Sequence, residues 1–249
     1  MAAPERRLDA IVLAGGRGTR LQSVVRDVPK PLALVGGRPF LDYQLQLLAS
    51  SGRVRQVVLA VGHLADRIIE HYTQHPPPLP VDFVVEHALL GTGGAARNAL
   101  DATTSDRVLV LNGDSVFRWD LDALAEVHAS LRPEATLSLV RVGDVGRYGS
   151  VVVEEGRIRT FVEKGGPGGP GLINAGVYLF ERETLGAIAS GCVTSLETDV
   201  FPVLAARGAL AAAQFDSPFI DIGLPETYKA APTVLESMAA SHGPAAPKP

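Results

Sequence analysis

A glycine-rich segment near the N-terminus combines a turn with fixed positive charge: Leu13–Pro31 has the sequence LAGGRGTRLQSVVRDVPKP. Its glycines let the backbone come close to a ligand, because glycine has no Cβ and adopts angles that other residues rarely adopt. Successive N–H groups in such a turn form a concave site for phosphate oxygens. Arg20 and Lys30 add cations, and the prolines beside Lys30 favour an extended segment. The segment therefore predicts a phosphate-binding site; a tight strand-to-helix turn with two surface cations is the alternative.

Two aspartates, Asp114 and Asp221, are further candidates for a functional site. Asp114 follows the apolar run Val108–Leu111, which predicts a buried strand, and ligands of open α/β sheets lie beyond the carboxyl ends of strands. Asp221 lies between apolar neighbours, where a carboxylate without a partner would be costly. For an aspartate after a strand, a loop or helix-capping role is the alternative.

Strand and helix patterns alternate through the first half of the chain, which is typical of βαβ units. Short apolar runs predict strands at Asp9–Ala14, Val57–Val61, Val81–Val85 and Val108–Leu111. Apolar residues at helical spacing predict helices at Phe40–Ala49, Leu64–Tyr72 and Gly93–Leu100. The expected fold class is α/β and Rossmann-like, with a mixed, mainly parallel sheet and helices on both faces.

The second half of the chain adds a small antiparallel extension. Strands are predicted at Leu137–Val142, Gly149–Val153, Ile158–Glu163 and Gly176–Phe180, with a flexible stretch at Gly165–Gly171. Helices are predicted at Leu121–Ser130, Leu196–Ala206 and Pro225–Met238. We expect one domain over residues 8–236, with disordered tails at 1–7 and 237–249.

Composition argues against several classes of protein. The chain has 249 residues and a formal net charge of −4, which argues against a sequence-independent nucleic-acid binder. Cys192 is the only cysteine, so an intramolecular disulfide is impossible. No apolar run approaches the roughly 20 residues that span a bilayer, and Met1–Arg7 lacks the apolar stretch of a signal peptide. We therefore expect a cytoplasmic protein with no nucleic-acid and no membrane partner.

Short blocks in a fixed order resemble the sugar nucleotidyltransferase family, from Ala10 to about Ala230. GGxGTRL is followed by PKP, whose lysine stands ten residues after the arginine. Six later blocks are LGTGGA (90–95), LNGD (111–114), RYG (147–149), EK (163–164), NAG (174–176) and FIDIG (219–223). One short motif is weak support, whereas the ordered set is specific. The resemblance implies the nucleotide-diphospho-sugar transferase type of fold. It also implies transfer of a nucleoside monophosphate from a nucleoside triphosphate to a sugar 1-phosphate, with release of pyrophosphate.

In that reaction two polyanions meet for in-line attack on the α-phosphorus, so positioning and charge neutralisation dominate catalysis. Mg²⁺ held by one or two carboxylates is the usual solution, and by resemblance Asp114 and Asp221 are its ligands. Arg20 and Lys30 are the expected catalytic residues, since they can bind the triphosphate and stabilise the leaving pyrophosphate. Direct displacement requires no nucleophilic serine or cysteine.

The resemblance assigns the remaining site residues to two groups. The nucleotide is expected at Leu13, Ala14, Gly15, Gly16, Arg17, Gly18, Thr19, Glu86, Gly91, Thr92 and Gly93. The sugar phosphate is expected at Asn112, Gly113, Tyr148, Gly149, Glu163, Lys164 and Asn174. Structural alternatives are solvated side chains at Arg17 and Glu86, a surface ion pair at Lys164, a turn at Tyr148–Gly149 and backbone capping by Asn174.

Substrate identity depends on a narrower resemblance. FIDIG followed by PE and a tyrosine, together with LGTGGA, is most similar to the D-glycero-α-D-manno-heptose 1-phosphate guanylyltransferases. This implies GTP, heptose 1-phosphate and GDP-heptose for a surface polysaccharide or glycoprotein. Mannose 1-phosphate with GTP, glucose 1-phosphate with dTTP or UTP, and N-acetylmuramate 1-phosphate with UTP stay open, because their enzymes share the N-terminal signature.

A remote alternative is a non-catalytic regulatory subunit of the same fold, which would have no chemical need for the four residues Arg20, Lys30, Asp114 and Asp221. A homo-oligomeric assembly, and closure of Gly165–Gly171 over substrate, are left open by the sequence.

Overall fold

A nine-stranded mixed sheet forms the centre of the protein. The computed structural model describes residues 7–162 and 168–240. Four neighbouring strands from the first half are parallel, in the order β5 (Val81–Val85), β4 (Val54–Val61), β1 (Leu8–Ala14) and β6 (Arg107–Asn112). Every residue of β1 is buried except the half-buried Leu13. Such a buried run, apolar except for Asp9, is typical of a parallel strand covered on both faces.

The second half of the chain completes the sheet with antiparallel pairs. β11 (Gly171–Glu181) runs antiparallel to β6 and to β8 (Ala135–Val142), and β12 (Leu210–Phe215) is parallel to β8. β10 (Arg157–Val162) and β9 (Ser150–Glu154) form an antiparallel edge. The sheet is therefore mixed and mainly parallel with a small antiparallel extension, as predicted.

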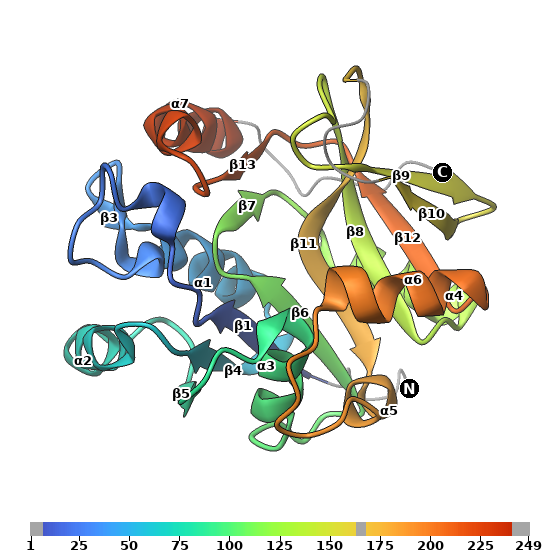
Figure 1. Ribbon diagram of the computed structural model, residues 1–249, viewed down its shortest axis with the longest axis horizontal. Helices are drawn as coiled ribbons and strands as arrows, with labels where there is room; N and C mark the ends of the chain where they lie inside the picture. Colours follow the sequence, from blue (N-terminus) through green and yellow to red (C-terminus); the bar gives the residue numbers. More distant parts are fainter. Residues whose placement is uncertain (1–6, 163–167, 241–249) are drawn as a thin grey trace.

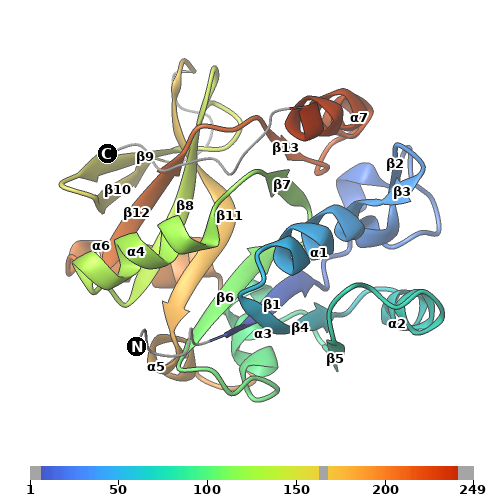
Figure 2. The same cartoon turned by 180° about the vertical axis from the view of Figure 1, so that it is seen from behind.

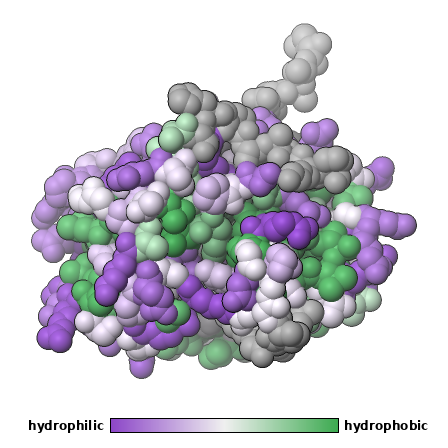
Figure 3. Space-filling model, turned by 90° about the horizontal axis from the view of Figure 1, so that it is seen from above, coloured by the Kyte–Doolittle hydropathy of each residue, from purple (hydrophilic) through white to green (hydrophobic). Residues whose placement is uncertain are grey.

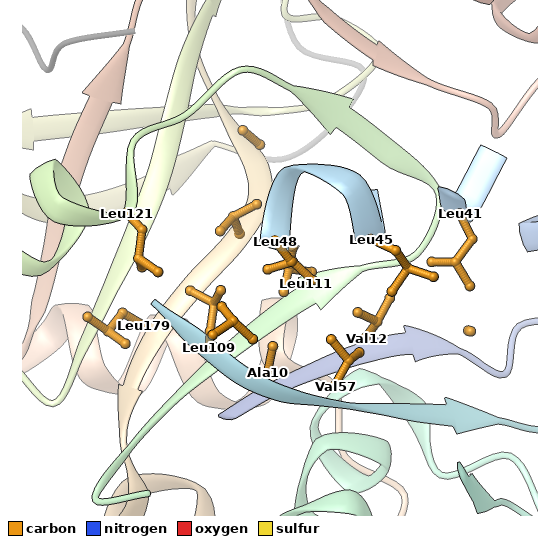
Figure 4. Packing of buried hydrophobic residues seen from close by; sticks show 14 of the residues in the cluster. Ala10, Val12, Leu41, Leu45, Leu48, Val57, Leu109, Leu111, Leu121 and Leu179 are labelled. Carbon is orange, nitrogen blue, oxygen red and sulfur yellow. The ribbon is translucent and has the colours of Figure 1, made fainter. Parts of the chain in front are cut away.

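Helices cover both faces of this sheet (Figures 1 and 2). One face carries α1 (Phe40–Ser50), α2 (Ala65–Gln74) and α4 (Leu121–Leu131). The other carries α3 (Gly91–Leu100), α5 (Arg182–Gly186) and α6 (Phe201–Ala206). Figure 4 shows Leu41, Leu45 and Leu48 of α1 lying against Val12 and Leu111 of the sheet. Full burial of one leucine contributes about 1.5–3 kcal/mol, so this contact fixes α1 over the strands that carry the site.

A separate two-stranded ladder joins the C-terminal segment to the centre of the chain. β7 (Ser115–Phe117) follows β6 after a two-residue turn and pairs antiparallel with β13 (Phe219–Asp221). α7 (Pro225–Ala240) packs on this ladder through the buried Ala231 and Leu235, which share a core with Val116 and Ile220. β2 (Leu34–Val35) and β3 (Arg38–Pro39) form a second short ladder.

Hydrophilic residues cover much of the face seen in Figure 3, and hydrophobic residues form separate areas between them.

Some predicted boundaries are wrong. The helix predicted at Leu196–Ala206 is a π-helical turn over Leu196–Val200 followed by α6. Pro202 lacks an N–H group, so it interrupts the regular helical hydrogen bonds there. α7 continues to Ala240 with Met238 buried, so residues 237–240 are helical instead of belonging to a disordered tail. β11 begins at Gly171, five residues before the predicted strand.

Five strands have no counterpart among the predictions: β2, β3, β7, β12 and β13. β12 consists largely of alanine, which gives little strand signal. β7 and β13 have three residues each, too short for a pattern of alternating hydrophobicity. Within the described ranges, the helices are all too short or too polar to cross a membrane.

Candidate active site

The turn after β1 forms one wall of a hollow of about 230 Å³. Gly18 has a φ of 60°, the left-handed conformation that favours glycine, and a 3-10 helix over Thr19–Leu21 follows it. Arg20 is exposed and lines this hollow, and Arg17 lines an adjoining one of about 450 Å³. In the part of the chain that the structure describes, neither arginine pairs with a carboxylate. The turn therefore presents two cations to an anionic ligand.

The same hollow brings together many of the residues that the sequence predicts for the site. Its lining residues are Leu13, Ala14, Gly16, Gly18, Thr19, Arg20, Lys30, Pro31, Gly113, Asp114 and Gly223. They come from the end of β1 and the turn after it, the PKP segment, the turn after β6 and the segment after β13.

Lys30 begins a 3-10 helix over Lys30–Leu32, so the extended segment predicted there is wrong, and its side chain reaches across the hollow to Asp114. Its stem packs along Gly18, where an added Cβ would lie 3.2 Å from the Cβ of Lys30. The Nζ atom lies 2.5 Å from Oδ2 of Asp114. The Lys30 side chain is 12% exposed and that of Asp114 43%. The lysine is thus held in place at the floor of the hollow by one of the two predicted metal ligands.

The β7–β13 ladder brings the two predicted metal ligands side by side. In the ladder Asp221 lies opposite Ser115, which is next to Asp114 in the sequence. The N–H of Ile222 donates to the backbone carbonyl oxygen of Asp114 at 2.9 Å. A Cβ on Gly223 would lie 2.7 Å from Oδ1 of Asp221 and 3.7 Å from Nζ of Lys30. Both carboxylates therefore lie close to the same ammonium group.

This pair of carboxylates suits Mg²⁺, which proteins bind through one or two carboxylates together with waters and substrate phosphates. Across residues 7–162 and 168–240, no cluster of three or more His, Cys, Asp or Glu side chains fits a metal ion. The two carboxylates alone therefore do not form an all-protein metal cage. In the structure a cation faces each of them: Lys30 on Asp114 and Arg147 on Asp221.

Asp221 is surrounded by donors. Nη2 of Arg147 lies 2.6 and 2.5 Å from its two oxygens, the hydroxyl of Tyr148 donates at 2.9 Å, and the N–H of Gly223 donates at 2.8 Å. Burial and the neighbouring carboxylate raise the pKa of Tyr148 to about 12, so its hydroxyl remains a donor. The sequence assigned Tyr148 to the sugar phosphate and gave Arg147 no role. The arginine of the RYG block was the sequence feature from which a role for Arg147 could have been predicted.

The turn that carries Asp114 is fixed by two contacts. The N–H of Gly113 donates to the carbonyl oxygen of Leu13 at 2.9 Å, and a Cβ on Gly113 would lie 2.6 Å from that oxygen. Nε2 of the buried Gln44 donates to the carbonyl oxygens of Asn112 and Ser115, at 2.6 and 2.5 Å. Sequence reasoning missed Gln44, although an amide on the leucine-rich face of α1 is an unusual core residue.

Glu86 lies at the inner end of the glycine-rich turn. Its Oε1 lies 3.0 Å from the position of a Cβ on Gly15, and its Oε2 accepts from the N–H of Leu90 at 3.5 Å. Burial raises the pKa of Glu86. A half-buried carboxylate beside this turn is suited to accept from the N–H groups of a nucleobase edge.

Gly91, Thr92 and Gly93 form the first turn of α3, so this helix begins at Gly91 and the predicted start at Gly93 is wrong. The N–H of Gly93 donates to the carbonyl oxygen of Thr194 at 2.8 Å, and the Thr92 hydroxyl donates to Glu197 at 2.6 Å. These bonds satisfy groups that an isolated loop would leave to solvent, and they start the helix two residues early.

The predicted sugar-phosphate residues fall into two places. Asn112 and Asn174 both donate to the hydroxyl of the buried Tyr178, at 3.2 and 3.0 Å. Asn174 also accepts from the N–H of Gly176 at 2.9 Å, which is the backbone-capping alternative. Tyr148 instead lies at Asp221.

Gly149 has a φ of 76° and its N–H donates to Val145, so Tyr148–Gly149 is also a turn. Glu163 and Lys164 lie outside the described residues.

Comparison with known proteins identifies the relatives of this chain. The profile of the family described as Nucleotidyl transferase matches residues 9–237. The chain is 34% identical over 229 residues to a D-glycero-alpha-D-manno-heptose 1-phosphate guanylyltransferase of Aneurinibacillus thermoaerophilus, covering 92% of this chain and 99% of that protein. It is 36% identical over 226 residues to a mannose-1-phosphate guanylyltransferase of Mycobacterium tuberculosis, covering 89% of this chain and 63% of that protein.

Solved structures give the same result. The crystal structure of HddC from Yersinia pseudotuberculosis complexed with GMP-PN is similar with a TM-score of 0.79 and 36% identity, covering 91% of this chain and 98% of that one. A putative glucose-1-phosphate thymidylyltransferase from Bacillus anthracis, at 21% identity and a TM-score of 0.78, shares the fold. The profile match over most of the sequence, with these relatives, shows that the chain belongs to the nucleotidyl transferase family.

Proposed function

We propose that this chain transfers the guanylyl group of GTP to D-glycero-α-D-manno-heptose 1-phosphate, giving GDP-heptose and pyrophosphate. One observation carries this proposal: a single hollow gathers a glycine-rich turn, Arg20, Lys30 and Asp114, with Asp221 beside it. The similarity to a heptose 1-phosphate guanylyltransferase over 99% of that protein's length supports the choice of substrates.

The cations of the hollow would position the triphosphate. Arg20 and Lys30 line the hollow and the exposed Arg17 lines the adjoining one, so the phosphates of GTP are expected along the turn after β1. A phosphate oxygen of the sugar 1-phosphate attacks the α-phosphorus in line. The new P–O bond forms as the bond from the α-phosphorus to the bridging oxygen breaks, and pyrophosphate leaves with the electron pair. Arg20 and Lys30 stabilise the charge that develops on this leaving group.

Asp114 and Asp221 are proposed to hold Mg²⁺. When bound, this ion neutralises phosphate oxygens and helps to orient them. The protein contributes the two neighbouring carboxylates, held in place by the β7–β13 ladder and by Gln44 beneath the turn. An Asp114→Asn variant is expected to lose most of its turnover, because it removes one of the two negative charges.

Glu86 is the proposed reader of the base. Guanine presents an N1–H and an exocyclic amine on one edge, and a carboxylate can accept from both. Adenine presents an acceptor at N1, which would face the Glu86 carboxylate unfavourably. Glu86→Gln is therefore expected to raise the KM for GTP more than the KM for the sugar phosphate.

Mannose 1-phosphate is the second candidate for the sugar substrate. It is supported by the 36% identity to a mannose-1-phosphate guanylyltransferase, although the chain spans 63% of the length of that protein. A role in polysaccharide biosynthesis, a cytoplasmic location and a homo-oligomeric assembly stay predictions within this proposal.

The proposal is tested by measuring pyrophosphate release from purified protein with five nucleoside triphosphates and a panel of sugar 1-phosphates. Turnover is expected to be fastest with GTP and the heptose, and to stop when a chelator removes Mg²⁺. Fast turnover of mannose 1-phosphate without turnover of the heptose would change the sugar assignment. Activity that survives the chelator would contradict the metal assignment.

A further inference from the structure

We propose that Arg147 is a stand-in cation: it neutralises Asp221 while no metal is bound, and it turns to the phosphate of the sugar 1-phosphate when Mg²⁺ takes its place. This inference depends on the proposed function, since it concerns the same metal ion and the same second substrate. It makes Arg147 a positioning residue for Asp221 in one state and a substrate-binding residue in the other.

The position of one nitrogen carries the first half of the proposal. Nη2 of Arg147 lies 2.6 and 2.5 Å from the two oxygens of Asp221, where it fills the space between them. The other donors to this carboxylate, the Tyr148 hydroxyl and the Gly223 N–H, are neutral and approach one oxygen each. Of these three groups only Arg147 is a cation, so it is the one that a metal ion would have to displace from the negative charge of Asp221. The two neutral donors keep the carboxylate oriented while the cations exchange.

Release of Arg147 leaves a cation that needs a new partner. Its side chain is 32% exposed and its guanidinium lies 4.8 Å from the centre of the Tyr148 ring, so it is partly desolvated. Removing the partner of such a charge is costly. Asp144, three residues before it, accepts from the N–H groups of Gly146 and Gly169 through Oδ1, and among the described residues the ion pair of Arg147 is with Asp221. The incoming sugar 1-phosphate supplies the missing anion beside Tyr148.

The other ion pair of the site behaves differently. Lys30 is 12% exposed, and its stem is packed against Gly18. It can contact phosphate oxygens without moving far from Asp114. Arg147 has more freedom, because it lies on the loop between β8 and β9 and its guanidinium reaches the surface. The exchange of cations is therefore expected at Asp221 and not at Asp114.

The first experiment measures Mn²⁺ binding to the full-length protein without nucleotide, by the electron paramagnetic resonance signal of the free ion. Arg147→Gln is expected to bind Mn²⁺ about fivefold or more tightly than the wild type, because the competing cation is gone. Arg147→Lys keeps the positive charge but loses the nitrogen that lies between the two oxygens of Asp221. Its affinity for Mn²⁺ is therefore expected to lie between those of the wild type and Arg147→Gln. Asp221→Asn should lose this binding. Arg207→Gln is the control, since Arg207 pairs with Glu134 outside the site.

The second experiment measures steady-state kinetics with GTP and a sugar 1-phosphate. In Arg147→Gln the KM for the sugar 1-phosphate is expected to rise about tenfold or more while the KM for GTP stays close to that of the wild type. A purely structural role for Arg147 would move both constants or lower kcat alone.

Clear outcomes would overturn the inference. Equal or weaker Mn²⁺ affinity in Arg147→Gln refutes the stand-in role, and an unchanged KM for the sugar 1-phosphate refutes the transfer to substrate. If Arg147→Gln does not fold, an Arg147→Lys affinity no tighter than that of the wild type refutes the stand-in role on its own. Failure of the proposed function is distinct: the wild type would then release no pyrophosphate with any sugar 1-phosphate.

Discussion

Replacing Gly113 with alanine would place a methyl carbon 2.6 Å from the carbonyl oxygen of Leu13. Ordinary van der Waals contact begins at 3.4 Å, so β1 and the turn after β6 must separate by about 0.8 Å. Both groups are backbone, and the N–H of Gly113 donates to the same oxygen, so no side chain can absorb the shift. Overpacking of this kind costs about 1–3 kcal/mol of folding stability. A misplacement near 1 Å at a reacting centre can cost on the order of 100-fold in rate.

The control for this substitution is Gly143→Ala. Gly143 follows β8, has no left-handed φ, and a Cβ there would meet nothing within 4 Å. Guanidinium unfolding should show the loss of stability for Gly113→Ala and a change within about 0.5 kcal/mol for Gly143→Ala. Pyrophosphate release should fall steeply in the first variant only. If both variants unfold and turn over like the wild type, the argument from close approach at Gly113 is refuted.

Three further substitutions test other parts of the structure. Gln44→Leu removes the donor to the carbonyl oxygens of Asn112 and Ser115, so the free energy of unfolding in urea should fall by about 1–3 kcal/mol; an unchanged value would contradict the clamp on the Asp114 turn. Glu86→Gln should be more stable than the wild type at neutral pH, because burial raises the pKa of Glu86 and its ionised form destabilises the folded state. That gain should vanish as the pH falls below the ordinary pKa of glutamate, and a gain independent of pH would contradict the cause. Asp9→Asn should lose about 2–4 kcal/mol at neutral pH, since buried Asp9 accepts from Arg55 and from the N–H groups of Thr104 and Ser105. Burial opposes ionisation of Asp9, but these hydrogen bonds outweigh it and lower the pKa of Asp9. The difference in unfolding free energy between Asp9→Asn and the wild type should therefore shrink as the pH falls through that lowered pKa.

The sequence predicted the first half of the fold well because each strand and helix there has its own local pattern. β5 was predicted to the residue, and α1 to within one residue of its end. The sequence also indicates that the glycine-rich turn and the LNGD block lie at the same edge of the sheet, because each follows a parallel strand. The structure adds the reason: Leu13 and Asn112 are partners in neighbouring strands.

Contacts between distant segments were not predictable in the same way. Arg147 and Gln44 act through residues far along the chain, and neither has a local pattern that indicates its partner. The pairing of β7 with β13 joins two three-residue strands that share a core with α7. Tertiary packing decides such short elements, so a single sequence carries little trace of them.

The β7–β13 ladder also has a consequence for the order in which the enzyme is made. All nine strands of the large sheet end by Phe215, whereas Asp221 follows them and reaches Asp114 only through β13. A chain synthesised as far as Phe215 contains the whole sheet and the glycine-rich turn, but one of the two carboxylates is still missing. A segment synthesised after the whole sheet therefore completes the site, so a chain that stops at Phe215 is expected to hold nucleotide without consuming it.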